Sequence, residues 1–186
     1  MPKLLQRPAR SPVSHAQNLG FTLLEGLVVV VIIALLAMIV APGFLGFLEQ
    51  RKINATRSSI YQALRATQRD AGQNRQTQQF SLREQDGYLE WANHPETISP
   101  AQVTLWMPLT EGVLLADEDN TLLNKSGVYY VRFNFQGDVQ SQLGTITITG
   151  SGGRLTHRCI IVSTLIGALR QGEGHLKKNG NGRYCY

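Results

Sequence analysis

The chain has 186 residues, enough for one globular domain of ordinary size. Its formal net charge is +5, but the first twenty residues carry three cations and no acid, so the remainder holds 15 basic and 13 acidic side chains. That remainder is uneven: residues 21–75 sum to +3, residues 76–150 to −6 and residues 151–186 to +5. This distribution excludes a uniformly basic protein, and only the C-terminal piece is distinctly basic.

Residues 1–20 contain three prolines and three cations without a sustained apolar pattern, and they are predicted to be a cytoplasmic leader. No charged side chain lies between Glu25 and Glu49, and this apolar run is long enough to cross a bilayer as a helix. Because the residues before it are basic, the chain after it is expected outside the cytoplasm. We therefore predict an inner-membrane, single-pass protein with a periplasmic C-terminal domain.

Glu25 is the unusual residue of the apolar run, because an ionised carboxylate in hydrocarbon costs about 2.5 to 3.5 kcal/mol on insertion scales unless it is paired. One alternative is a signal-anchored protein in which Glu25 reaches the membrane surface. A secretory signal peptide would need a small-residue cleavage site after the run, but Pro42 follows the most suitable residue, Ala41.

The sequence Gly20-Phe21-Thr22-Leu23-Leu24-Glu25, followed by a long apolar helix, resembles the class III signal of type IV prepilins and of type II secretion pseudopilins. The resemblance implies that prepilin peptidase cuts after Gly20 and methylates the new N-terminal residue, Phe21. It also implies that Pro42 bends the helix, since proline removes one backbone hydrogen bond. The partners implied are other pilins or pseudopilins in a filament.

Cleavage after Gly20 would create an α-amine on Phe21, one helical turn before Glu25 or within reach of a neighbouring subunit. A buried carboxylate that is paired with an amine is tolerated where a lone one is not. We therefore expect Glu25 to act in filament assembly.

Residues 21–48 are predicted to form the membrane and assembly helix, and an amphipathic helix is expected to continue to about residue 74. Gly72 is the predicted stop, and residues 73–79 are expected to form a loop. The arginines of this helix lie off the apolar stripe. We expect them to form a solvated face rather than a stripe that binds nucleic acid, because acidic residues are interspersed with them. The stripe itself is expected to pack on a domain, and its members recur at helical spacings: Phe44, Phe47, Leu48, Ile53, Ile60, Leu64 and Ala71.

After residue 79 the pattern changes to alternation, which is typical of strands. Gln85-Asp86-Gly87 predicts a hairpin between strands at 80–84 and 88–92. Further strands are predicted at 103–107, 113–116, 128–135, 144–149 and 155–164. The expected fold is α+β and type IV pilin-like: one long N-terminal helix packed on an antiparallel sheet, with residues 49–186 as the globular domain.

A second resemblance lies in the run from Phe133-Asn134-Phe135-Gln136-Gly137 to Gly167-Ala168-Leu169-Arg170, whose order is similar to that of GspH- and FimT-type pseudopilins. It implies a minor pilin or pseudopilin that helps to initiate or cap a type IV pilus or type II secretion pseudopilus. The alternative it raises is a FimT-like subunit that binds DNA for uptake in natural transformation.

Catalytic motifs are not apparent. The four histidines are scattered without metal spacing, and neither a nucleophile elbow nor a P-loop occurs, so we predict no enzyme activity, no metal and no cofactor. The acidic group at residues 117–120 could bind calcium through oxygen ligands, although a solvated loop is favoured because the order of an EF-hand is missing.

Cys159 and Cys185 are the only cysteines, and an oxidising compartment favours a disulfide between them. Such a bond would pin the C-terminal tail and contribute about 3 kcal/mol in the chain-entropy model. The tail carries Lys177, Lys178 and Arg183 beside two tyrosines. Together with Arg170, these cations could contact DNA; the alternative is that they keep an exposed end soluble.

Overall fold

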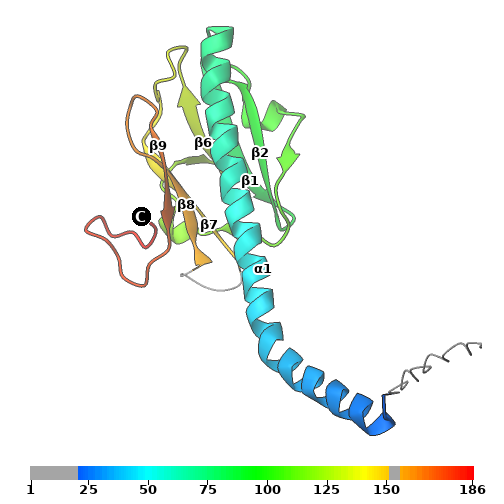
Figure 1. Ribbon diagram of the computed structural model, residues 1–186. Helices are drawn as coiled ribbons and strands as arrows, with labels where there is room; N and C mark the ends of the chain where they lie inside the picture. Colours follow the sequence, from blue (N-terminus) through cyan, green and yellow to red (C-terminus); the bar gives the residue numbers. More distant parts are fainter. Residues whose placement is uncertain (1–20, 151–155) are drawn as a thin grey trace, which may run out of the picture. The chain divides into compact units, whose positions relative to one another are not determined.

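The computed structural model describes residues 21–150 and 156–186, with residues 40–42 described by their backbone alone. The chain forms two compact units, Met1–Pro42 and Gly43–Tyr186, which we treat separately; we call the second the head. Helix α1, Leu23–Asn74, has 52 residues and belongs to both units (Figure 1). The predicted leader with Gly20 lies outside the described residues, as does the side chain of Pro42, so their roles stay predictions.

The buried stripe of α1 in the head contains Ile53, Ile60, Leu64 and Ala71, all fully buried as predicted. Phe44, Phe47 and Leu48, which were expected to continue it, are exposed instead. Two threonines complete the stripe: Thr56 donates its hydroxyl to the carbonyl of Lys52 at 3.0 Å, and Thr67 to that of Ala63 at 2.9 Å. These bonds within the helix allow a hydroxyl to be buried without an unsatisfied donor.

Helix α1 ends at Asn74 rather than at Gly72, the predicted stop. Arg75 takes the left-handed conformation with φ 51°, and the backbone N–H of Gln76 donates to the carbonyl of Ala71 at 3.3 Å. This is the bond pattern of a Schellman cap, built here without glycine. The loop predicted at 73–79 is correspondingly short, since β1 begins at Gln78.

The rest of the head forms two antiparallel sheets rather than the single sheet that was expected. The first has the strand order β3-β2-β1-β6-β5 and the second β4-β7-β8-β9. The elements are β1 Gln78–Gln85, β2 Tyr88–Pro95, 3₁₀ helix η1 Pro100–Gln102, β3 Met107–Pro108, β4 Leu114–Leu115, 3₁₀ helix η2 Asp117–Asp119, β5 Leu123–Lys125, β6 Val128–Phe133, β7 Gly144–Thr149, β8 Arg158–Val162 and β9 Leu169–Glu173.

The predicted hairpin is confirmed. Gln85 pairs with Tyr88, and the two residues between them, Asp86 and Gly87, have φ values of 53° and 80°. Positive φ at both central positions defines a type I′ turn, whose twist matches that of the flanking strands.

Other strand predictions need correction. Of the strands expected at 103–107 and 113–116, only Met107 and the pair Leu114–Leu115 are extended in a sheet. Strand β6 stops at Phe133 because the side chain of Asn134 accepts the backbone N–H groups of Gln136 and Asp138, both at 2.9 Å, which starts a turn. Strands β5 and β9 were not predicted at all.

One hydrophobic core joins α1 to both sheets. The first sheet supplies Phe80, Leu82, Leu89, Val131 and Phe133, and the second supplies Ile146, Ile148, Ile160 and Val162. In Figure 1 the head portion of α1 lies across both sheets. The fold is therefore α+β, with a long N-terminal helix packed on antiparallel sheet, as the sequence predicted.

Candidate functional site: the N-terminal helix and the C-terminal hairpin

The first turn of α1 is capped by Thr22. Its hydroxyl accepts the backbone N–H of Glu25 at 3.2 Å, and its carbonyl accepts the N–H of Gly26 at 3.1 Å. Thr22 and Glu25 stand in the spacing of a capping box, and a carboxylate in the first turn is favoured by the positive end of the helix dipole. The helix that was predicted to follow the cleavage site therefore begins immediately after Phe21 and Thr22, with Glu25 in its first turn.

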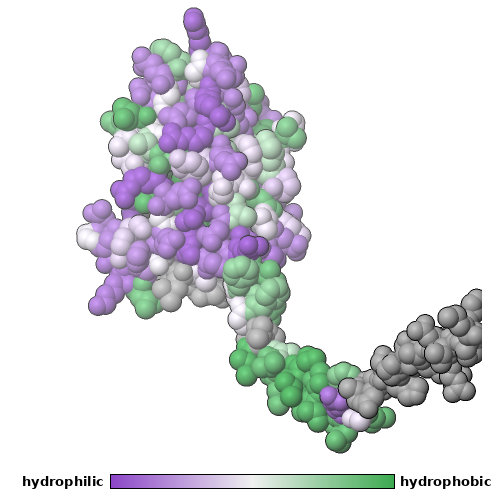
Figure 2. All heavy atoms as spheres, viewed as in Figure 1, coloured by the Kyte–Doolittle hydropathy of each residue, from purple (hydrophilic) through white to green (hydrophobic). Residues whose placement is uncertain are grey.

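The surface of α1 from Leu23 to Ile39 is apolar and exposed. All its large apolar side chains lie open: Leu23, Leu24, Leu27, Val28, Val29, Val30, Val31, Ile32, Ile33, Leu35, Leu36, Met38 and Ile39. Figure 2 shows this helix as a continuous hydrophobic surface, whereas the head presents mixed, mainly hydrophilic residues. Soluble monomers rarely expose so much contiguous apolar surface.

Among the described residues, no single helix is long and apolar enough to qualify as a candidate membrane span. The segments Leu23–Ile39 and Gly43–Asn74 qualify only together, as one bent candidate span.

The C-terminal tail is a hairpin rather than a fraying end. Glu173 and Tyr186 exchange two backbone hydrogen bonds, each 3.2 Å long, and the N–H of His175 donates to the carbonyl of Tyr184 at 2.8 Å. The predicted disulfide between Cys159 and Cys185 is present and buried, with 6.1 Å between the Cα atoms. We call residues 173–186 the C-terminal hairpin.

Gly172 and Arg57 hold this hairpin in place. A Cβ on Gly172 would lie 2.8 Å from the sulfur of Cys159, so only glycine fits beside the disulfide. The guanidinium of Arg57 on α1 donates to the carbonyl of Gly172 at 3.3 Å. Burial lowers the pKa of Arg57, the charge of Arg158 lowers it further, and Glu173 opposes both effects.

The four predicted DNA-contacting cations are not equally available. Lys177 and Lys178 are exposed in the loop of the C-terminal hairpin, and the ammonium of Lys178 lies 5.1 Å from the centre of the Tyr184 ring. Arg170 is exposed on β9. Arg183 is half-buried and donates to the hydroxyl of Thr145 at 2.8 Å, which makes it a structural residue.

The acidic group at 117–120 is not simply the solvated loop that was favoured. The carboxylate of Asp119 is buried and accepts the backbone N–H of Tyr184 at 3.1 Å, which ties η2 to the C-terminal hairpin. Asp117 accepts the phenol of Tyr129 at 3.0 Å; burial raises the pKa of Tyr129, and the charge of Asp117 adds to the increase. Within residues 21–150 and 156–186, no cluster of three or more His, Cys, Asp or Glu is placed to hold a metal.

A series of polar side chains, buried except at Arg132, is hydrogen-bonded across β6, β1 and β2 and was not anticipated. The guanidinium of Arg132 donates to Gln79 at 2.9 Å, Gln79 donates to Ser81 at 2.9 Å, and Ser81 bonds Nε2 of His94 at 2.9 Å. Ser81 is fully buried and cannot reach a substrate, so this hydrogen-bonded series of side chains stabilises the sheet. The only sequence signal was the alternation of Gln79 and Ser81 with Phe80 and Leu82.

Neither a family model nor a curated protein matches the sequence. Among solved structures, the chain is similar to the type IV minor pilin FimU of Pseudomonas aeruginosa strain PAO1, with 14% identity over 67% of this chain and 90% of that chain and a TM-score of 0.47. It is also similar to the minor pseudopilin EpsH of the Type 2 Secretion System of Vibrio cholerae, with 18% identity over 64% of this chain and 95% of that chain and a TM-score of 0.43.

Proposed function

We propose that the chain is a minor pilin or pseudopilin, a structural subunit of a type IV pilus or a type II secretion pseudopilus. Prepilin peptidase removes residues 1–20 by cutting after Gly20 and methylates Phe21. The mature subunit is held in the inner membrane with its head in the periplasm, and it is then extracted into the fibre. The motif order from Phe133 to Arg170 supports a low-copy subunit that initiates or caps the fibre.

The observation that carries this proposal is the uncovered apolar surface of α1 from Leu23 to Ile39. In a membrane this surface faces lipid, and in a fibre it faces the helices of other subunits. Both surroundings remove it from water, at roughly 25 cal/mol for each Å² of apolar surface. Such a helix can therefore exchange lipid for neighbouring subunits, which is what assembly of a filament from membrane subunits requires.

Glu25 makes the assembled fibre more favourable than the membrane-held subunit. A carboxylate in an apolar environment is strongly disfavoured unless an opposite charge pairs with it. The α-amine that cleavage creates on Phe21 supplies that charge, either one turn away or on an adjacent subunit. Pairing between subunits makes the assembled fibre the state in which both charges are compensated.

Substitution of Gly20 tests the processing step. Gly20→Leu should leave the full-length precursor in the membrane when prepilin peptidase is present, as measured by the mass of the membrane-bound chain. Gly26→Ala is the matched control, because a Cβ on Gly26 would meet no atom within 4 Å, and it should be processed normally. Normal processing of the Gly20 variant would reject the proposal.

Glu25→Gln tests the assembly step. The variant keeps the shape of the side chain but loses its charge, so it should be processed normally and should enter fibres at least tenfold less than the unmodified subunit. The measurement is quantitative immunoblotting of sheared fibres against membranes. Equal incorporation of both proteins would show that the carboxylate is not the assembly determinant.

DNA binding is the second candidate, favoured by the two exposed lysines that the disulfide-pinned hairpin presents together. Lys177→Ala with Lys178→Ala should weaken DNA binding by the detergent-solubilised full chain and reduce its salt dependence. Lys125→Ala, an exposed lysine on β5, is the control that should bind like the unmodified chain. Absence of DNA binding by the unmodified chain would reject this candidate.

A further inference from the structure

Apolar side chains occupy the tips of two neighbouring turns of the head, residues 134–137 and residues 164–167. In each turn the backbone N–H of the last residue donates to the carbonyl of the first, at 2.9 Å and 3.0 Å respectively. The central positions hold Phe135, Leu165 and Ile166, which are 57%, 64% and 75% accessible. Turns are usually built from Gly, Pro, Asn, Asp and Ser, so apolar tips are not explained by turn formation. We call these two segments the paired turns.

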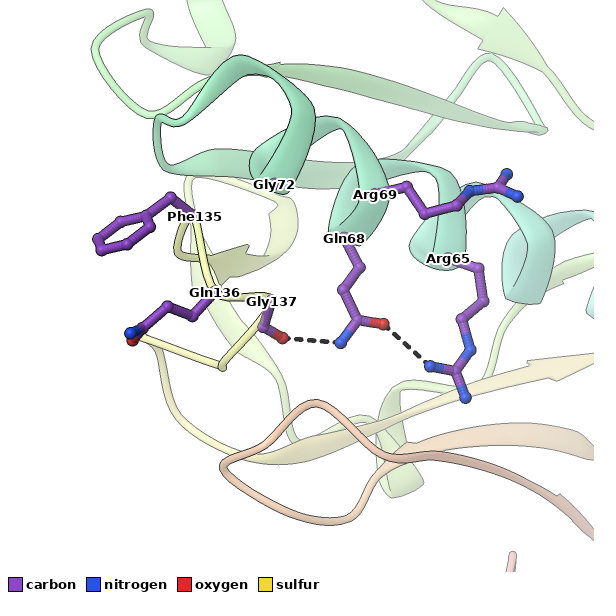
Figure 3. A pocket seen from close by; sticks show the side chains of 7 residues that line it. All are labelled: Arg65, Gln68, Arg69, Gly72, Phe135, Gln136 and Gly137. Atoms are coloured by element: carbon purple, nitrogen blue, oxygen red, sulfur yellow. Dashed lines mark hydrogen bonds between the residues drawn. The ribbon is translucent and has the colours of Figure 1, made fainter.

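Gln68 of α1 holds the paired turns side by side. Its side-chain amide donates to the carbonyl of Gly137 at 2.7 Å and to that of Gly167 at 3.4 Å. Figure 3 shows the first of these bonds and the ring of Phe135, which points away from α1. Because one buttressing side chain fixes both turns, little conformational freedom is lost when their apolar tips enter another environment.

Three arginines lie beside the paired turns. Arg65 and Arg69 of α1 line a hollow of about 490 Å³ together with three residues of the first turn, and no acid lines it (Figure 3). Arg170 is exposed on β9, three residues after the second turn. The side chains of Arg69 and Arg170 make no hydrogen bond or ion pair with the described residues, so both are available to a ligand.

The acids nearest to these arginines in sequence are fewer and less available. Asp70 follows Arg69, but its carboxylate accepts the side-chain amide of Asn93 at 2.5 Å and is therefore held toward β2. Asp138 directly follows the first turn and is half-buried. The paired turns themselves contain no acid, so cations predominate around their apolar tips.

An anionic lipid bilayer matches this combination of features. Affinity for such a surface increases with the apolar area that enters the headgroup and acyl boundary and with the attraction of cations to anionic lipids. Each basic side chain near the surface contributes roughly fivefold in affinity, and guanidinium groups bind phosphate oxygens in pairs. A protein partner would need a concave apolar surface shaped to receive the projecting tips, whereas a bilayer accepts them without one.

We propose that the paired turns bind the surface of an anionic phospholipid bilayer. Their apolar tips enter the boundary between headgroups and acyl chains, and the three arginines bind lipid phosphates. This contact would hold the head against a membrane through residues far in sequence from the apolar surface of Leu23–Ile39. It goes beyond the proposed function, because it depends on the head alone and not on processing or assembly.

Vesicle sedimentation tests the proposal on the full chain. The chain is placed in nanodiscs of phosphatidylcholine, which carries no net charge and covers the apolar surface of α1. The loaded discs are mixed with dense vesicles of phosphatidylcholine alone or of phosphatidylcholine with phosphatidylglycerol. We expect the loaded discs to sediment with the anionic vesicles and not with the neutral ones, while empty discs sediment with neither.

Two double variants separate the arginines of this surface from charge in general. Arg69→Gln with Arg170→Gln removes two cations without breaking a side-chain bond, and it should weaken binding to anionic vesicles by roughly tenfold or more. Arg51→Gln with Lys52→Gln is the matched control, because it removes two exposed cations elsewhere on α1 and should bind like the unmodified chain.

A fluorescent label reports whether the tips enter the bilayer. Ile166→Cys supplies one free thiol, since Cys159 and Cys185 are buried in their disulfide, and the thiol is labelled with nitrobenzoxadiazole. Anionic vesicles should move its emission to shorter wavelength and raise the intensity by about twofold or more as the label leaves water. Leu105→Cys is the control: Leu105 is 71% accessible but lies between η1 and β3, and its label should not respond.

The inference is overturned by equal sedimentation with neutral and anionic vesicles, by unchanged binding of the Arg69 and Arg170 double variant, or by equal responses of the two labels. Release from the vesicles by an equal concentration of inorganic phosphate would make this a site for free phosphate instead. Binding of poly-glutamate without binding of vesicles would assign the surface to an acidic protein. No arm requires cleavage after Gly20, so a negative result here leaves the proposed function standing.

Discussion

Helix α1 contains two apolar regions that the rest of the molecule treats in opposite ways. From Leu23 to Ile39 the side chains are exposed, and Leu35 is 58% accessible; in the head, Leu64 of the same helix is fully buried. The head residue has two sheets to pack on, whereas the described chain places nothing over the first region. Apolar side chains of one helix therefore have two outcomes: in the head they complete the core, and from Leu23 to Ile39 they stay exposed, which is the surface that the proposed function assigns to lipid or to another subunit.

The largest expected effect on stability comes from a comparison of two leucines of α1, one in each region. Leu64→Ala should lower the free energy of unfolding of the head by about 3 to 5 kcal/mol, because it removes a fully buried side chain and leaves a cavity. Leu35→Ala should leave head unfolding unchanged within about 0.5 kcal/mol, because its side chain is exposed. Denaturant unfolding of the detergent-solubilised chain measures both values, and a similar loss in both variants would contradict the division.

Removal of the disulfide tests how the head secures its C-terminal end. The bond joins residues 26 apart, so Cys159→Ser with Cys185→Ser should cost about 3.5 kcal/mol in the chain-entropy model. The loss should appear as a lower denaturation midpoint and as faster amide exchange at Tyr184 and Tyr186. An unchanged midpoint would indicate that Arg57 and Asp119 hold the C-terminal hairpin without the covalent bond.

Gly167→Ala tests the packing around Gln68, whose side-chain amide donates to the carbonyl of Gly137 at 2.7 Å and to that of Gly167 at 3.4 Å. Gly167 has φ 77°, and a Cβ there would collide with the Gln68 amide and with the carbonyl of Gly137. We expect a loss of about 2 to 3 kcal/mol from backbone strain and overpacking. Gly182→Ala is the control: its φ of 75° carries the same strain, but no atom lies within 4 Å of the added Cβ, so a loss of about 1 kcal/mol is expected. Equal losses would show that packing at Gly167 is unimportant.

The smallest effect concerns Tyr129. Its pKa is raised in the folded head, so the folded state keeps the phenolic proton where the unfolded state has lost it. Its contribution to stability is complete below about pH 10 and is lost as the pH rises through the raised value. Tyr129→Phe should therefore lose less stability between about pH 9 and about pH 11 than the unmodified chain, as measured by urea midpoints. An identical alkaline profile would contradict this assignment.

Local patterns explain why much of the fold could be predicted. The helical spacing of Ile53, Ile60, Leu64 and Ala71 and the turn Asp86-Gly87 are properties of short segments, and both are confirmed. Strand β9 and the C-terminal hairpin could not be predicted in the same way, since their order comes from long-range bonds such as that of Cys159 to Cys185. The end of α1 was misplaced because Arg75 takes a left-handed conformation more typical of glycine.

In the candidate site, too, residues with a local sequence signal could be predicted, and residues that depend on long-range contacts could not. Glu25 could be singled out from the sequence because it is the only charge at the start of a long apolar run. The cap that Thr22 forms on its backbone N–H was not predicted and is seen only in the structure. The structural roles of Asp119 and Arg183 could not be recognised, because their partners Tyr184 and Thr145 lie 65 and 38 residues away in sequence. Composition marked both residues as surface charges, and only tertiary contacts make them part of the head.

The proposed role of the N-terminal helix depends most on where the mature chain begins. Intact-mass measurement of the chain, extracted from membranes of cells with and without prepilin peptidase, addresses this directly. The account predicts that in the presence of the peptidase the chain begins at Phe21 and carries one additional methyl group, and that in its absence the chain retains the leader through Gly20. A chain that begins elsewhere, or keeps the leader in both cells, would contradict it.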